Sequence, residues 1–506
     1  MKIGRLTCIE VITLLAALAT PAGLAAEDSQ AQAKKPAQHH HHYQLIDLGT
    51  FGGPQSWVSG GFEGPFATIN DAGTVAGAAD TSDSNPNYPN CSNGSISCDL
   101  FGIPDPFAEH AFQFGNGSLT DLGVLAAGYN STAISVSANG LIAGISENGI
   151  IDPITGVSEA HGVLWNRDGQ IIDLGTLTGG TESDATSVNT KGQVAGASLA
   201  ASGNVRAIRW TEEEGMEDLG TLGACCSIAG TINERGQISG ESSLCDTCNQ
   251  DAFLWDHGKM YDIPDFGGPT SFHNDLNNGG QVVGQSDLPG GANAHAFVWD
   301  KKNGVKDLGT LGGAGSTAVW INDGGDVVGG ANTPGDQSFH ATLWKDGKVT
   351  DLGTIDPCSI AVSINSQDQI VGQSDNCDGI PRHAFLWENG GPIVDLNTVI
   401  GPGSDLTLTL AVSVNDRGEI AGRAITPSGD SHAFLLIPCD EHHLGLDGCD
   451  YSLVEGNTAA TGISPSRGIQ TSAPSGRIAP MFRGPVNPMQ GRFGRRLGPR
   501  YSAVTK

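Results

Sequence analysis

The sequence predicts an all-β protein, an eight-bladed β-propeller of four-stranded antiparallel blades. An N-terminal strand is expected to complete the last blade and close the ring. Three observations predict this fold. One phrase recurs eight times at nearly constant spacing, each copy holds four short strand-like runs, and the two ends of the array carry complementary partial copies. Repeats of roughly 20–50 residues are typical of propellers and solenoids.

The recurring phrase has three parts. Each copy begins with Asp-Leu-Gly-Thr or a variant, continues through an Asn-x-x-Gly turn and ends in a run such as His-Ala-Phe-Leu-Trp. The anchoring Asp residues are separated by 74, 52, 45, 44, 45, 44 and 44 residues, and are Asp47, Asp121, Asp173, Asp218, Asp262, Asp307, Asp351 and Asp395. Because repeats share one continuous core, this period overrides the roughly three domains that the chain length would otherwise indicate.

Four short apolar runs fill each period. In the sixth copy they are 317–322, 326–331, 340–344 and 348–352, which we name strands a, b, c and d. They are rich in Val, Ile, Leu and aromatic residues, and turn residues separate them, as expected of short strands. The a–b turn needs Asn, which bonds to its own turn, and Gly, which accepts the positive φ of a short reversal.

A glycine recurs inside strand b of all eight copies, where it is locally unfavourable. The residues are Gly77, Gly144, Gly196, Gly240, Gly284, Gly329, Gly372 and Gly422. The recurrence predicts that another backbone or a large aromatic ring approaches closely at this position. Strand c ends in Trp in six copies, so an indole ring is available to fill the space; these are Trp165, Trp210, Trp255, Trp299, Trp344 and Trp387.

The ends of the array favour a closed ring. The last copy has strands a, b and c, ending at 432–437, and no strand d. A lone strand at 43–48 precedes the first copy and carries the Asp-Leu-Gly ending of strand d, so it can complete the last blade. An open β-solenoid would explain the period, but it leaves the two partial copies unexplained.

The phrases DLGTLGG, IN-x-x-G-x-VVG and HAF-x-W recur in this order across residues 43–438. They resemble the HAF-repeat family of bacterial extracellular proteins. The resemblance implies secretion, but the family has no established activity and therefore carries over no catalytic residue. The fifth copy departs from the pattern at Asp262-Ile263-Pro264, and Arg206 and Asp251 replace the phrase's His in the third and fourth copies.

The N-terminal segment predicts export. Residues 1–26 combine two basic residues, a short apolar run and small residues, which is typical of a secretory signal peptide. The alternative is a membrane anchor, but the apolar run is too short to span a bilayer, and no later run is long enough. Residues 27–42 read as a solvated linker. Its four His at 39–42 could alternatively bind transition metals weakly or be an expression tag.

Two segments follow the ring. Residues 439–456 form an extension bounded by cysteines, and residues 457–506 are rich in Pro, Gly, Ser and Arg, which predicts disorder. This basic tail could contact an anionic cell surface. The chain's formal charge of −29 includes +8 from the tail, so the remainder carries −37. Such an acidic body repels nucleic acid but permits cations, basic partners and neutral glycans. We expect a monomer.

The blade geometry separates two faces. The a–b and c–d links share one face, the turn face, and the b–c and d–a links share the other, the loop face. Links on the loop face vary in length, and those of the first two copies span about 80–109 and 146–159. Binding residues concentrate on variable loops of rigid scaffolds, so we place a glycan or protein ligand here, at Trp57, Tyr88 and Phe101. Alternatively, these aromatic residues only pin a long insertion in place.

The recurring His and Asp residues are assigned to architecture. Catalysis needs one asymmetric constellation, whereas six His occupy equivalent positions: His110, His161, His295, His340, His383 and His432. We expect each to hydrogen-bond strand c to the neighbouring d–a corner. No catalytic residue and no cofactor is assigned. Calcium remains open at the short acidic motifs 80–85 and 375–378, neither of which has EF-hand spacing.

Ten cysteines lie outside the predicted signal, an even number that indicates disulfides in an exported chain. The expected pairs are Cys358–Cys377, Cys91–Cys98, Cys439–Cys449, and Cys225/Cys226 with Cys245/Cys248 in an undetermined order. The last four cysteines could alternatively bind zinc, although adjacent Cys225 and Cys226 have poor ligand spacing.

The function predicted from the sequence is therefore binding. Export, a rigid ring, variable loops and the lack of any triad or metal motif favour a binding or structural module at the cell exterior. The alternative is a secreted polysaccharide lyase or hydrolase with its site at the channel mouth, because propellers host such chemistry without the fold implying it.

Overall fold

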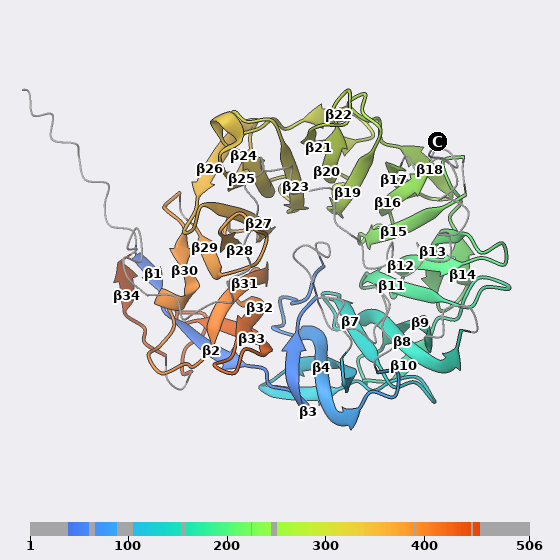
Figure 1. Cartoon of the computed structure of the whole chain (residues 1–506), viewed down its shortest axis with the longest axis horizontal. Coiled ribbons are helices and arrows are strands. Elements are labelled where there is room, and N and C mark those ends of the chain that lie inside the picture. The colour runs from blue at the N-terminus through green and yellow to red at the C-terminus, as the bar shows by residue number, and fades with distance from the viewer. Residues whose placement is uncertain are drawn as a thin grey trace, which may run out of the picture. The chain divides into compact units, whose positions relative to one another are not determined.

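The computed structural model describes residues 39–59, 66–88, 105–152, 158–223, 225–243, 250–388, 390–446 and 449–455. Within these ranges the chain forms eight four-stranded antiparallel sheets and one two-stranded sheet, with no α-helix. The eight sheets stand around a common centre in chain order (Figure 1). The predicted eight-bladed propeller is confirmed. The predicted signal peptide, most of the linker and the basic tail lie outside the described residues.

The first four blades each take their strands consecutively from the chain. Blade 1 holds β3 (Gly52–Trp57), β4 (Val75–Ser84), β5 (Phe107–Gly115) and β6 (Ser118–Asp121); blade 2 holds β7 (Ser131–Val136), β8 (Ile142–Ile151), β9 (Ser158–Trp165) and β10 (Ile171–Asp173). Blade 3 holds β11 (Ser183–Val188), β12 (Val194–Leu199), β13 (Val205–Thr211) and β14 (Gly215–Asp218); blade 4 holds β15 (Ser227–Ile232), β16 (Ile238–Ser243), β17 (Gln250–Asp256) and β18 (Lys259–Asp262).

The next three blades repeat this arrangement and the eighth closes the ring. Blade 5 holds β19 (Ser271–Leu276), β20 (Val282–Asp287), β21 (Ala294–Asp300) and β22 (Gly304–Asp307); blade 6 holds β23 (Ser316–Ile321), β24 (Val327–Asn332), β25 (Phe339–Lys345) and β26 (Lys348–Gly353). Blade 7 holds β27 (Cys358–Ile364), β28 (Ile370–Asp375), β29 (His383–Trp387) and β30 (Val394–Asp395); blade 8 holds β31 (Thr407–Val414), β32 (Ile420–Ile425), β33 (Ser431–Pro438) and the N-terminal β2 (Tyr43–Asp47). Short 3₁₀ turns occur at Pro334–Asp336 and Leu396–Thr398.

Closure of the ring follows the prediction. Strand β2 pairs antiparallel with β33, from Tyr43 opposite Pro438 to Asp47 opposite Phe434. Blade 8 then contacts blade 1 directly, because Arg423 Nε donates to the Val58 carbonyl oxygen at 3.0 Å. The two ends of the repeat array are therefore joined within one sheet, and no blade has to end the array with an open edge.

The histidine run departs from the predicted solvated linker. His39–His41 form strand β1, which pairs with β34 (Leu453–Glu455) of the C-terminal extension. The buried His40 imidazole lies 2.8 Å from the Glu388 carboxylate. The prediction is wrong for residues 39–41, because the extension supplies a pairing edge that the repeat pattern does not reveal.

Neighbouring atoms approach the recurring strand-b glycines closely from two sides, as predicted, but the ring that approaches is usually not that of tryptophan. A Cβ on Gly77, Gly240, Gly372 or Gly422 would lie 2.5–2.9 Å from a Phe ring of strand c and 2.1–2.2 Å from a strand-a carbonyl oxygen. Each of these glycines pairs directly with that Phe in the β-sheet register. Only blade 2 places its Trp there, with the Trp165 ring 2.9 Å from Gly144. In the register, each of these Trp residues pairs with the residue two positions before the glycine, as Trp387 does with Ile370.

Candidate functional site

The turn face is held by a belt of asparagine side chains. In the blade 4 turn, Asn233 Oδ1 accepts the N–H groups of Arg235 and Gln237 at 3.0 Å. Its Nδ2 donates to the Asn277 carbonyl oxygen of the next blade, also at 3.0 Å. The same inter-blade bond is donated by Asn70, Asn189, Asn277, Asn322, Asn365 and Asn415.

Blade 2 keeps the belt with a different residue. Ser137 replaces the turn asparagine, and Asn139 Nδ2 donates instead to the Thr190 carbonyl oxygen at 2.7 Å. Asn415 donates back to Asn70 at 2.9 Å and completes the circle. Because these amides are already used between blades, the belt side chains of the turn face are structural and offer no ligand site.

The recurring histidines make the predicted structural hydrogen bonds. In six blades the Nδ1 atom of the strand-c His lies 2.8–3.0 Å from the Asp carboxylate at the end of strand d: His110–Asp121, His161–Asp173, His295–Asp307, His340–Asp351, His383–Asp395 and His432–Asp47. In blade 3, Arg206 Nε donates to Asp218 at 3.1 Å. The assignment to architecture is confirmed for seven blades.

These pairs perturb both partners. Partial burial raises the carboxyl pKa of Asp47, but the hydrogen bonds from His432 and the Gly49 N–H outweigh it and hold the pKa below its ordinary value. The pKa is lowered for the same reasons at Asp121, Asp173 and Asp351. Conversely, the hydrogen bond to its Asp raises the pKa of the imidazole in His383 and His432.

Blade 4 breaks this pattern. Asp251 occupies the histidine position, is buried, and has a carboxylate oxygen, Oδ1, with no hydrogen-bond partner among the described residues. Burial, followed by repulsion from Asp262 and Asp265, raises the pKa of Asp251 to about 6. The blade therefore replaces an attractive pair with two like charges.

The aromatic residues proposed as ligand platforms have different outcomes. Trp57 is only 5% exposed, so the expectation that it presents an exposed ring is wrong; it lies in β3 and pairs with Ala78. Tyr88 is 53% exposed, as expected, and Phe101 lies outside the described residues. Sequence reasoning missed Tyr129, which is 50% exposed and lies in blade 2, where its N–H donates to Glu147.

A cleft lies on the loop face between blades 5, 6 and 7, not at blades 1 and 2. Its cavity volume is about 120 Å³. Its polar lining comes from three blades and includes Gln285, Asn293, Ser316, Thr317, Asn332, Asp336, Ser338, Ser359 and Asp375. The half-buried Phe339 ring adds an aromatic surface. A concave site with a few converging polar groups is the usual form of a small-molecule or sugar site.

One buried polar group of this cleft is a carboxylate with a free oxygen. Asp375, at the end of β28, is 5% exposed. Its Oδ2 atom accepts a hydrogen bond from the amide nitrogen of the fully buried Gln373, which is outside the lining, at 3.2 Å. The other carboxylate oxygen of Asp375 has no donor within the described part of the chain. Buried acceptors normally have donors, so this oxygen marks a place where one is expected to come from outside.

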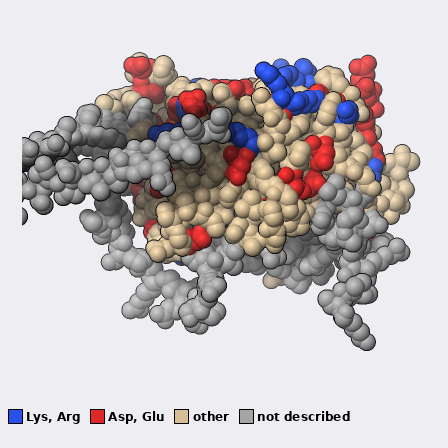
Figure 2. All heavy atoms as spheres, turned by 90° about the horizontal axis from the view of Figure 1, so that it is seen from above, with Lys and Arg blue, Asp and Glu red and all other residues tan. Residues whose placement is uncertain are grey.

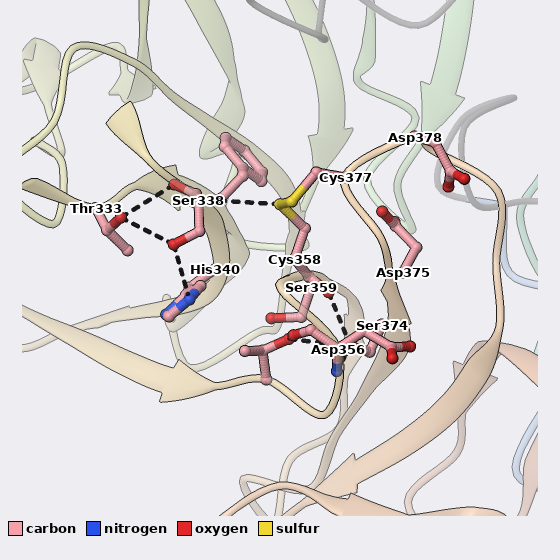
Figure 3. Close-up of a disulfide and its surroundings, with 12 residues drawn as sticks. Thr333, Ser338, His340, Asp356, Cys358, Ser359, Ser374, Asp375, Cys377 and Asp378 are labelled. Carbon is pink, nitrogen blue, oxygen red and sulfur yellow. Dashed lines mark hydrogen bonds between the residues drawn. A yellow bond between two sulfur atoms is a disulfide. The ribbon is translucent and has the colours of Figure 1, made fainter. Parts of the chain in front are cut away.

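A disulfide forms one wall of the cleft. Cys358, at the start of β27, is joined to Cys377 in the loop after β28, as predicted (Figure 3). The Phe339 N–H donates to Cys358 Sγ at 3.3 Å, which ties blade 6 to the same wall. Asp375, which ends β28, precedes Cys377 in the sequence, and Asp378 follows it; all three are labelled in Figure 3. The cross-link therefore fixes the segment that carries the free carboxylate.

The other cysteine predictions have different outcomes. Cys439–Cys449 is confirmed. Cys225 and Cys226 are free thiols in the structure, whereas Cys91, Cys98, Cys245 and Cys248 lie outside the described residues, so their pairing stays a prediction. Burial, followed by its hydrogen bond with Cys225, raises the pKa of the Cys226 thiol to about 12.

The acidic motif at 375–378 does not act as one chelating group. Asp375 lines the cleft, whereas Asp378 accepts a hydrogen bond from Arg382 at 2.7 Å. The described residues contain no group of three or more His, Cys, Asp or Glu side chains arranged to hold a metal ion. They also contain no helix that is long and apolar enough to cross a membrane.

The similarities of the chain to known proteins are distant. No family model and no curated protein matches the chain. The propeller domain of the Trilobed protease from Pyrococcus furiosus is 10% identical, with a TM-score of 0.38 over 71% of this chain and 96% of that one. TolB from Acinetobacter baumannii is 12% identical, with a TM-score of 0.31 over 78% and 96%.

A third similar structure is the acylaminoacyl peptidase of Pyrococcus horikoshii, at 11% identity and a TM-score of 0.36. The match covers 73% of this chain but only 59% of the peptidase. Similarities this low carry no argument about ligand or activity, so any function has to be argued from the cleft itself.

Proposed function

We propose that the protein is a secreted binding module that holds a glycan in the cleft between blades 5, 6 and 7. The free oxygen of the buried Asp375 is the observation that carries this proposal. Around it, Gln285 and Asn332 supply amide groups and Phe339 supplies an aromatic ring. Hydroxyl groups of a sugar match the amides and carboxylate, and the apolar face of a sugar ring matches an aromatic surface.

The rest of the molecule supports a binding role. Polar side chains of the turn face are committed to the inter-blade belt, so the loop face is the face that can differ from blade to blade. The cleft residues come from several loops on a closed, rigid ring, which pre-organises them for a ligand.

The proposal also includes secretion and membership of the HAF-repeat family. The signal-like segment 1–26 and the resemblance of residues 43–438 to the HAF-repeat family support an extracellular protein. The disulfides Cys358–Cys377 and Cys439–Cys449 agree with an oxidising compartment. Acidic side chains occur in several groups on the side of the molecule shown in Figure 2, which favours neutral or basic partners over anionic ones.

A glycan array probed with the full secreted chain tests this function. We expect binding of at least one glycan class, reduced about tenfold or more by Asp375→Asn, which removes the charge but keeps the shape. Asp378→Asn is the matched control, because this residue lies on the same loop and pairs with Arg382 outside the cleft lining. Loss of binding with Tyr88→Ala but not Asp375→Asn would move the site to blades 1 and 2.

One observation favours the enzymatic alternative, a polysaccharide hydrolase or lyase. Asp336 and Asp375 line the same cleft from loops of different blades. Paired carboxylates are the usual acid and base of glycoside hydrolysis. Asp336 Oδ1 accepts the Ala314 N–H at 2.6 Å, which fixes its position. Cleavage of a bound polymer that is lost in both Asp336→Asn and Asp375→Asn would establish the enzyme; binding without any cleavage would leave the module.

A further inference from the structure

The cleft has an unbalanced charge. Two carboxylates, Asp336 and Asp375, are among its lining residues, whereas no Lys, Arg or His of the described chain lines it. The nearby Arg382 on the Cys377 loop donates to Asp378 at 2.7 Å and is not part of the lining. A ligand that enters this cleft therefore meets negative charge with no built-in counterion.

One carboxylate oxygen of the cleft lining lacks a donor. Asp375 Oδ1 has no hydrogen-bond partner among the described residues, whereas Oδ2 accepts from the amide nitrogen of Gln373, a buried residue that is not part of the lining. A ligand group that donates to Asp375 Oδ1 and carries a positive charge would satisfy this carboxylate.

We propose that the ligand presents a primary ammonium group to Asp375, as an amino sugar with a free amine does. This inference rests on the proposed glycan-binding function and names its ligand class. An ammonium group has three donors and a positive charge, whereas a hydroxyl group has a single donor and no charge. The unpaired carboxylate oxygen of Asp375, in a lining where the described residues supply no cation, therefore favours the amine over the hydroxyl.

The same geometry discriminates against two related ligands. N-acetylation removes the charge and two of the three donors of the amine, and it adds bulk beside Asp375. A lysine side chain offers the ammonium but leaves the amides of Gln285, Asn293 and Asn332 without matching hydroxyl groups. A glycan with free amines satisfies both Asp375 and these amides.

The test compares oligosaccharides that differ at one position. Hexamers of β-1,4-linked glucosamine, glucose and N-acetylglucosamine share a backbone and differ only at carbon 2. Isothermal titration of the full secreted chain near 0.15 M salt should give a Kd about 10- to 100-fold lower for the glucosamine hexamer, as expected for a hydrogen-bonded charge. Asp375→Asn should reduce this preference to less than about threefold.

Charge-matched controls separate specific from general attraction. Asp378→Asn removes the same unit of charge from the same loop, so general attraction to the acidic chain falls equally in both variants. It should leave the preference unchanged. An equal loss in both variants would show unspecific attraction and overturn the proposal. For the unaltered chain, the preference should also weaken as rising pH deprotonates the amine, which tests the idea without any variant.

The outcomes distinguish the two proposals. Equal binding of all three hexamers would overturn the ammonium inference and leave the glycan-binding function standing. Binding of none of them, with no other glycan bound on the array, would overturn both. Competition by a lysine-containing peptide when no sugar binds would assign the cleft to a protein partner and also overturn the inference.

Discussion

The two faces of the propeller use their polar side chains in different ways. On the turn face, the amide of each belt asparagine donates to the following blade, and blade 2 uses Asn139 where Ser137 interrupts the pattern. On the loop face, the cleft between blades 5 and 7 leaves one carboxylate oxygen of Asp375 without a donor among the described residues. The repeated amides of the turn face thus satisfy the neighbouring blades, whereas this cleft keeps an acceptor for a group from outside.

The repeated His–Asp pairs refine this comparison, because they belong to the loop-face ends of strands c and d. They are as regular as the asparagine belt, and each Asp also accepts a backbone N–H two residues later, as Asp121 does from Gly123 at 2.7 Å. A face can therefore carry both architecture and a binding site. A structural group has its hydrogen-bond partner within the chain, whereas a binding group keeps a free acceptor for the ligand.

Removing the cleft disulfide should have the largest effect. We expect the double change Cys358→Ser, Cys377→Ser to lower the free energy of unfolding by about 2–4 kcal/mol, because the cross-link restricts the unfolded chain. Ligand binding at the cleft should weaken as well, since the disulfide holds Cys377, which lies two residues after Asp375 at the end of β28. Chemical denaturation and the glycan titration measure both. Unchanged binding in a destabilised variant would show that the loop is held without the disulfide.

Breaking the belt should separate stability from binding. Asn233→Ala removes the inter-blade bond to Asn277 and three bonds within its own turn. Because Asn233 is buried, we expect a loss of about 2 kcal/mol in unfolding free energy, with no change in ligand affinity. Asn303→Ala, at an exposed c–d turn where Asn303 bonds only within the turn, is the control and should cost less than about 0.5 kcal/mol. A changed affinity in Asn233→Ala would contradict the division of roles.

The fold was largely predictable from the sequence, because period, strand pattern and complementary ends depend on local spacing. The exchange of Trp for Phe beside the strand-b glycines was missed, since it depends on cross-strand register: Gly372 pairs with Phe385, and Trp387 lies two residues on. Strand β1 was missed because its partners are distant in the sequence. It pairs with β34 near the end of the described chain, and His40 hydrogen-bonds to Glu388, which is 348 residues away.

The candidate site was less predictable than the fold. The sequence indicated the loop face, but long loops and aromatic residues drew attention to blades 1 and 2. The cleft instead combines short loops of three blades, and Gln285, Asp336 and Asp375 become neighbours in one lining only when the ring is built. The available signal was the cysteine pair of blade 7, which departs from the repeat at the same loop as Asp375.

Restoring the pattern in blade 4 should stabilise the protein. Asp251→His would recreate the pair that six other blades form with the strand-d Asp, here Asp262. The pKa of Asp251 is raised from 3.8 to about 6, so the wild-type group is stabilising when protonated and loses that contribution as pH rises from about 4 through 6. We expect a gain of about 1–2 kcal/mol at pH 7 and little at pH 4. Thermal melts at both pH values measure it, and a loss at pH 7 would show that Asp251 has a partner outside the described residues.

The smallest expected effect concerns the repeated His–Asp pairs and tests whether they contribute to the free energy of unfolding. A lowered carboxyl pKa at Asp47, Asp121, Asp173 and Asp351 contributes stability above pH 3.8 that is lost as pH falls through the folded value. The raised imidazole pKa of His432 contributes stability below pH 6.5 that is lost as pH rises through its folded value. The pairs are thus most stabilising between about pH 4 and 6.5. Because the carboxylates are partly exposed, each pair contributes less than about 1 kcal/mol. Asp47→Asn should flatten the pH dependence of the melting temperature at both ends of this window, and a parallel shift at all pH values would assign its effect to packing instead.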